Sequence, residues 1–141
     1  MQVIDLNTFE FIRASGPDKI QFLQGQTTCD VATLTESKSL PGAICNLKGR
    51  VVADFQIALH RNDCVLRTTG GTAEAILATL SKYAVFSKVE LKIDTEVIRA
   101  FGFIGDDAEK FLISRFRSLP AEIGNCIAVP GGLLLRITSQ I

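Results

Sequence analysis

The sequence lacks an excess of charge of either sign. Its 141 residues include 15 Lys and Arg and 15 Asp and Glu, so the formal net charge at pH 7 is zero. Proteins that hold a nucleic-acid backbone need clustered Lys and Arg to neutralise the phosphates. The local basic spots are pairs, Lys48 with Arg50 and Arg115 with Arg117, and neither forms a stripe. We therefore expect no strong direct binding of nucleic acid.

Long apolar runs are also missing. No segment approaches the roughly 18 apolar residues of a membrane-spanning helix. The first eleven residues lack the basic start and the apolar stretch of a signal peptide. We expect a protein without membrane association, located in the cytoplasm or, in a eukaryote, in the mitochondrial matrix.

Cysteine is scarce and scattered, and histidine occurs once. Cys29, Cys45, Cys64 and Cys126 form no C-x-x-C pair, which argues against a zinc site or a disulfide framework. We predict no metal site, and we expect most of these thiols to be reduced and buried. His60 precedes Cys64 by four residues, but no third group is evident to orient such a pair for nucleophilic chemistry. No catalytic residue is predicted.

The clearest periodic segment is 51–60. Val51, Ala53, Phe55, Ile57 and Leu59 alternate with the polar residues Asp54, Gln56 and His60. This period of two predicts a strand with one face in the core. Residues 43–47 are its expected partner across a hairpin turn at 48–50, and 64–69 form a third strand.

Other segments complete an α+β pattern. We predict strands at 9–14, 89–93 and 97–104, and a hairpin of 126–129 with 133–137. Helices are predicted from Pro17 in a first turn to near Gly25, from an N-cap at Thr72 to Ala84, and from 105 to Phe116. Hairpin-linked strands mixed with helices indicate a mainly antiparallel sheet with packed helices. Residues 1–141 show no linker or repeat and read as one domain.

Three segments together resemble a known family. Residues 16–18 (GPD) with 22–31 (FLQGQTTCDV) are similar to the opening of YgfZ-type proteins. Residues 42–55 (GAICNLKGRVVADF) resemble the hairpin of that family, and residues 82–89 (KYAVFSKV) resemble its helix end. Their order and spacing also fit the family, which belongs to the superfamily of the glycine-cleavage T-protein, an aminomethyltransferase.

The resemblance implies a fold, a cofactor and partners. The fold is one of ferredoxin-like subdomains around a cleft for tetrahydrofolate or a derivative. The role is maintenance of iron–sulfur enzymes, including those that modify tRNA, so reduced folate and such enzymes are the expected partners. The family's later motif K-G-C-Y-T-G-Q-E and its C-terminal barrel domain are absent here. We therefore expect a truncated N-terminal folate-binding domain without turnover of its own.

The resemblance also implies where folate contacts fall. Aminomethyltransferases carry an acidic pair at the position of Ala53-Asp54, and one of its carboxylates faces the reactive nitrogens of folate. Asp54 is thus predicted to accept a hydrogen bond from a pterin N–H, or else it is a solvent-facing strand residue. Phe9 corresponds to a position for an aromatic ring against the pterin, or it packs in the core.

The hairpin turn supplies the remaining candidates. Lys48 and Arg50 are predicted to contact the glutamate tail of folate, or an RNA or protein anion, unless they are simply exposed turn charges. Asn46 either contacts the ligand or caps the turn with its side chain. For residues 26–30 we favour a helix end with local hydrogen bonds over a cleft wall.

Three functions remain open at this point. The first is a folate-binding accessory protein of the YgfZ type. The second is an aminomethyltransferase-like enzyme that moves a one-carbon unit between a carrier and tetrahydrofolate. The third is a protein-interaction module without a ligand, which recruits an iron–sulfur or tRNA-modifying partner.

Overall fold

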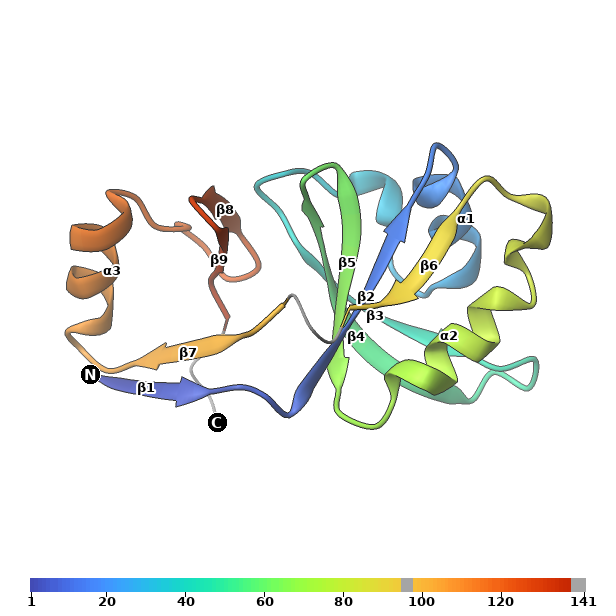
Figure 1. The fold of residues 1–141 in the computed structure, drawn as a ribbon, viewed down its shortest axis with the longest axis horizontal. Helices are drawn as coiled ribbons and strands as arrows, with labels where there is room; N and C mark the ends of the chain where they lie inside the picture. Colours follow the sequence, from blue (N-terminus) through green and yellow to red (C-terminus); the bar gives the residue numbers. More distant parts are fainter. Residues whose placement is uncertain (95–97, 138–141) are drawn as a thin grey trace.

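The computed structural model describes residues 1–94 and 98–137, which form an α+β fold (Figure 1). The first half comprises β1 (Gln2–Asp5), β2 (Phe9–Ser15), α1 (Lys19–Gln26), η1 (Val31–Thr33), β3 (Leu40–Cys45), β4 (Val51–His60) and β5 (Asp63–Thr69). The second comprises α2 (Ala73–Ser81), η2 (Ala84–Phe86), β6 (Glu90–Ile93), β7 (Phe101–Ile104), α3 (Ala108–Phe116), β8 (Cys126–Val129) and β9 (Gly132–Leu135). η1 and η2 are single 3₁₀ turns.

A five-stranded sheet forms the main body, with the strand order β3-β4-β5-β2-β6 and antiparallel pairing throughout. The path β2, α1, β4, β5, α2, β6 is a ferredoxin-like β-α-β-β-α-β unit. β3 extends this unit by one strand beside β4. The predicted fold class, a mainly antiparallel α+β fold with ferredoxin-like organisation, is confirmed.

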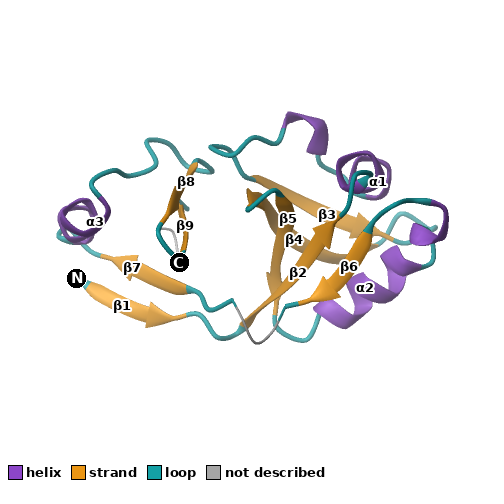
Figure 2. Ribbon diagram, turned by 45° about the horizontal axis from the view of Figure 1, so that its top comes forward, coloured by secondary structure: helices purple, strands orange, loops and turns teal. Residues whose placement is uncertain are grey.

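Helices α1 and α2 cover one face of this sheet (Figure 2). Leu23 of α1 and Ile76 and Leu80 of α2 are at most 1% exposed and pack against Ile12 and Leu66 of the central strands. Each such aliphatic side chain stabilises the fold by about 1.5–3 kcal/mol when it leaves water. This core explains why the alternation of residues 51–60 predicted β4 correctly.

The remaining elements lie beside the sheet, on the side away from α1 and α2 (Figure 1). β1 pairs with β7, and β8 pairs with β9. α3 packs on the β1–β7 ribbon through Phe111, whose ring centroid lies 5.9 Å from that of Phe103. Phe111 nevertheless stays 43% exposed and Ile113 48% exposed, so this helix buries less of its apolar surface than α1 and α2.

Several boundaries differ from the prediction. β1 was not predicted, because its four residues pair with a segment nearly one hundred positions away. The predicted strand 97–104 is present only as Phe101–Ile104, and residue 97 lies outside the described residues. Pro17 precedes the N-cap Asp18 rather than entering the helix. The second helix ends at Ser81, and residues 84–86 form the 3₁₀ turn η2.

Thr72 occupies the predicted N-cap of α2, but its hydroxyl does not cap the helix. That hydroxyl donates to the Thr69 carbonyl oxygen at 2.6 Å. The carboxylate of Glu10 accepts the backbone N–H groups of Gly71 and Ala73 instead. A distant β2 side chain therefore caps the helix, with a negative charge at the positive end of the helix dipole.

Candidate functional site

The face of the sheet opposite α1 and α2, here called the helix-free face, carries two of the predicted ligand residues, Asp54 and Phe9. Alternation along the strands places these side chains there: Phe9, Phe11 and Arg13 of β2, Asp54, Gln56 and Ala58 of β4, and Val65 and Arg67 of β5. Phe11 and Ala58 are buried yet do not belong to the core cluster on the helix side. The helix-free face is therefore distinct from the core, and two of its side chains, Phe11 and Ala58, are covered by other parts of the chain.

The pairing register brings Asp54 and Phe9 to the same end of this face. Gln56, Arg67 and Phe11 lie side by side across β4, β5 and β2. Asp54 and Phe9 each precede their member of this row by two residues. Both are thus diagonal neighbours of Arg67, at the usual spacing of about 7–8 Å between backbones.

Asp54 has an exposed side chain, and among the described residues its carboxylate has no hydrogen bond or ion pair. Its backbone carbonyl accepts a hydrogen bond from the hydroxyl of Thr68 at 2.9 Å. Ala53, by contrast, is 7% exposed and points into the core. Ala53 and Asp54 thus face opposite sides of the sheet, and of these two positions Asp54 lies on the helix-free face.

Phe9 combines an aromatic ring with a neighbouring pocket. The guanidinium carbon of Arg67 lies 4.5 Å from the centroid of the Phe9 ring, a cation–π arrangement. Phe9 and Phe11 also line a pocket of about 200 Å³, together with Leu6, Asn7, Ile98, Arg99 and Ala100. Phe9 is half-buried, so the core-packing alternative accounts for only part of its surface.

Arg67 was not selected from the sequence. Burial lowers the pKa of its guanidinium, which stays protonated at neutral pH as arginines do. Strand β5 alternates as clearly as β4, with Cys64, Leu66 and Thr68 buried on the helix side. That pattern would have placed Arg67 on the face of Asp54, had the strand register been known.

The turn residues are arranged around Asn46. Its side-chain oxygen accepts the backbone N–H groups of Lys48 at 2.9 Å and Arg50 at 3.1 Å, so the predicted turn-capping alternative is confirmed. Gly49 closes the turn with φ +74°. Lys48 and Arg50 are exposed and, within the part of the chain that the structure describes, make no ion pair. They precede the N-terminal end of β4, which is the end nearer to Asp54.

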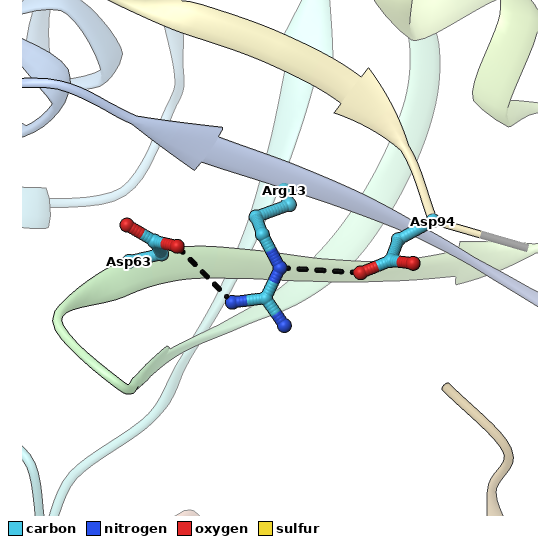
Figure 3. A network of polar contacts seen from close by, with 3 residues as sticks. All are labelled: Arg13, Asp63 and Asp94. Atoms are coloured by element: carbon cyan, nitrogen blue, oxygen red, sulfur yellow. Dashed lines mark hydrogen bonds and ion pairs between the residues drawn. The ribbon is translucent and has the colours of Figure 1, made fainter. Parts of the chain in front are cut away.

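Arg13 forms a polar network further along the helix-free face (Figure 3). Its guanidinium donates to Asp94 from Nε at 3.2 Å and to Asp63 from Nη1 at 3.2 Å. Asp94 is 5% exposed and Arg13 19% exposed, so the network is largely removed from solvent. Arg13 is committed to the fold, whereas Arg67 has no carboxylate partner among the described residues.

His60 and Cys64 lie on opposite faces. His60 pairs with Asp63 in the register, and Cys64 pairs with Leu59 on the core side. Burial raises the pKa of Cys64 to about 11, which leaves the thiol unreactive at neutral pH. The geometry thus separates the two groups. All four cysteines are free, with Cys64 and Cys126 buried and Cys29 and Cys45 half-buried.

Comparison with known proteins identifies the family. The family model described as "GCVT N-terminal domain" matches residues 1–122. This chain belongs to the GCVT N-terminal domain family. The tRNA-modifying protein YgfZ of Hamiltonella defensa is 38% identical over 120 residues, which cover 85% of this chain and 35% of that protein. The protein of the same name from Vibrio atlanticus is 30% identical over 140 residues, which cover 99% of this chain and 42% of that protein. The resemblance to YgfZ-type proteins is confirmed.

The GCVT N-terminal domain described here also matches a solved structure. The glycine cleavage system aminomethyltransferase T from Bartonella henselae superposes with a TM-score of 0.75 at 20% sequence identity, over 88% of this chain and 34% of that one. This likeness shows the fold. The chain spans less than half the length of the relatives it matches. No helix among the described residues is long and apolar enough to cross a membrane.

Proposed function

We propose that this GCVT N-terminal domain binds tetrahydrofolate or a derivative on the helix-free face, as part of a YgfZ-type accessory protein. The observation that carries the proposal is the joint placement of Asp54 and Phe9 at one end of that face. A carboxylate without an internal partner suits the N–H groups of a pterin, and an aromatic ring suits its flat π-system. Asn46, Lys48 and Arg50 lie at the same end, where the two cations suit the glutamate tail.

The wider role proposed is support of iron–sulfur enzymes and of tRNA modification. The relatives' name, tRNA-modifying protein YgfZ, supports the tRNA part. A zero net charge favours action through an enzyme partner rather than through direct RNA binding. We place the protein in the cytoplasm, or in the mitochondrial matrix of a eukaryote.

One-carbon transfer is the second candidate, and the exposed carboxylate of Asp54 is the observation in its favour. The buried Ala53 counts against it, because the neighbouring acid of the aminomethyltransferase pattern is replaced by a core residue. Production of methylene-tetrahydrofolate from an aminomethyl donor would establish this alternative.

The folate proposal is tested by calorimetric titration of the chain with 5-formyltetrahydrofolate. Asp54→Ala is expected to weaken binding by about tenfold, the usual effect of losing a hydrogen bond to a charged group. Glu74→Ala serves as the matched control, since Glu74 is an exposed carboxylate on α2, across the sheet from the site. Equal affinities of the two variants would place the ligand elsewhere, and no binding by the unmodified chain would contradict the proposal.

A further inference from the structure

Arg67 is a half-buried cation whose guanidinium has no hydrogen-bond acceptor among the described residues. Within residues 1–94 and 98–137 its guanidinium makes no hydrogen bond and no ion pair, and its one polar interaction is with the Phe9 ring at 4.5 Å. No buried side-chain nitrogen or oxygen among these residues lacks a partner. The guanidinium nitrogens of Arg67 therefore keep contact with the surface of the helix-free face.

Arg13 shows that an arginine on this face of the sheet can have carboxylate partners. Arg13 lies on the same face, one strand away, and two carboxylates occupy its donors. A guanidinium that lies over an aromatic ring keeps its in-plane N–H groups for another acceptor. Leaving a partly desolvated arginine without an acceptor costs free energy, which an acceptor on a bound ligand would recover.

The register fixes what else such a ligand would meet. Asp54 and Phe9 are the diagonal neighbours of Arg67 toward one end of the face, on the strands that flank it. The carboxylate accepts hydrogen bonds and the guanidinium donates them, about 7–8 Å apart between backbones. A single bicyclic ring with N–H donors on one part of its edge and a carbonyl oxygen on another would satisfy both groups.

We propose that Arg67 donates a hydrogen bond to the carbonyl oxygen of the pterin ring and thereby selects oxo-pteridines over amino-pteridines, an inference that rests on the proposed folate site. An amino group in place of the carbonyl would direct its N–H donors at the guanidinium of Arg67, which is itself a donor. The arginine then loses its acceptor and meets a ring that protonates more readily. A site built to hydrogen-bond a polar group discriminates strongly against an analogue that cannot make that bond.

The test compares tetrahydrofolate with tetrahydroaminopterin, which differ in the carbonyl or amino group on the ring and in the proton that the carbonyl form carries on the adjacent ring nitrogen. Calorimetry on the unmodified chain is expected to show a preference for tetrahydrofolate of about tenfold or more. Arg67→Gln is expected to reduce this ratio to within about threefold, whereas Arg61→Gln keeps it. Arg61 is exposed in the β4–β5 turn, so its variant removes the same charge away from Asp54.

Arg67→Lys provides a second variant if Arg67→Gln fails to fold, since it keeps the apolar stem and one donor group. It is expected to show a preference between those of the unmodified chain and Arg67→Gln. Equal affinity of the unmodified chain for both ligands, or an unchanged ratio in Arg67→Gln, would overturn the role of Arg67 and leave the folate site standing. Failure of the unmodified chain to bind either ligand would overturn both proposals.

Discussion

At the scale of single residues, the helix-free face holds two arginines with different tasks. Arg13 forms ion pairs with Asp63 and Asp94, and Arg67 makes a cation–π contact with Phe9. A buried ion pair adds little net stability over an apolar pair, but removing one partner leaves the other charge buried and uncompensated. An arginine that stabilises the fold therefore differs from a candidate ligand-binding arginine in its burial and its ion-pair partners, not in its residue type.

The Arg13 network gives the first residue-scale prediction. Arg13→Ala is expected to lower the free energy of unfolding by about 2–4 kcal/mol, because it leaves the buried carboxylate of Asp94 unpaired. Arg99→Ala breaks the exposed pair with Asp5 and is expected to cost at most about 1 kcal/mol. Urea denaturation of both variants measures the difference, and equal losses would contradict the structural role given to Arg13.

His60 gives a prediction about pH. Burial, then Arg13 and Arg61, lowers the pKa of His60 below the ordinary 6.5, while Asp63 opposes this. The folded state then binds fewer protons than the unfolded state in the window below pH 6.5, so stability falls as the pH falls through it. His60 is the single histidine, so an NMR titration reads its pKa directly.

The control for this prediction is His60→Gln, compared in urea at about pH 7.5 and about pH 5.5. The unmodified chain should lose more stability than the variant between these conditions. A His60 pKa at or above 6.5 would show that burial and the arginines do not act as described.

At the scale of elements, the segments that reveal the family mostly hold one another in place. The backbone N–H of Asp18 donates to the Lys88 carbonyl at 3.2 Å, and the Asp18 carboxylate accepts the Lys88 N–H at 2.7 Å. The Thr28 hydroxyl accepts the Ala43 N–H at 2.9 Å, and the Thr28 N–H donates to the Ala43 carbonyl. We predicted local hydrogen bonds for residues 26–30; the Thr27 hydroxyl donates one to the Leu23 carbonyl at 2.8 Å, whereas Thr28 bonds to Ala43 of β3.

Gly16 and Gly49 allow a matched test of this structural role. Gly16 has φ +105°, and a Cβ there would lie 2.4 Å from the Lys88 carbonyl oxygen. Gly16→Ala is expected to destabilise the protein by about 2 kcal/mol or more, through strain and collision together. Gly49 has φ +74° with open space around it, so Gly49→Ala is expected to cost about 1 kcal/mol.

Thermal or urea denaturation measures these two glycine variants. A Gly16→Ala variant as stable as Gly49→Ala would mean that the turn and the Lys88 segment separate easily. The interlock between the family segments would then be weaker than the hydrogen bonds indicate.

The sequence predicted elements well where periodicity is local, as in β4, β5 and α2. It erred where long-range geometry decides. Val51 was assigned to the core face but is 65% exposed, because the β3–β4 register shifts at Ile44 and Cys45, just before the turn. Thr72 is the N-cap of α2, as predicted, but the capping hydrogen bonds come from Glu10 on a distant strand.

At the scale of the whole molecule, the candidate site depends on pairings that no local pattern contains. Asp54 and Phe9 lie 45 positions apart in the sequence, and only the order β4-β5-β2 brings them to one face. The sequence supplied both residues through the family resemblance. It could not supply Arg67, their diagonal neighbour on β5, because strand order and register are properties of the assembled sheet.

The central claim, a folate ligand on the helix-free face, is tested most directly by NMR. Amide shifts of the isotopically labelled chain would be followed during titration with 5-formyltetrahydrofolate. The account predicts that the largest changes fall on Phe9, Asp54 and Arg67 and their strand neighbours, with little change in α1 and α2. Changes confined to those helices, or to another pocket, of about 300 Å³ and lined by His60 and Val129, would contradict it.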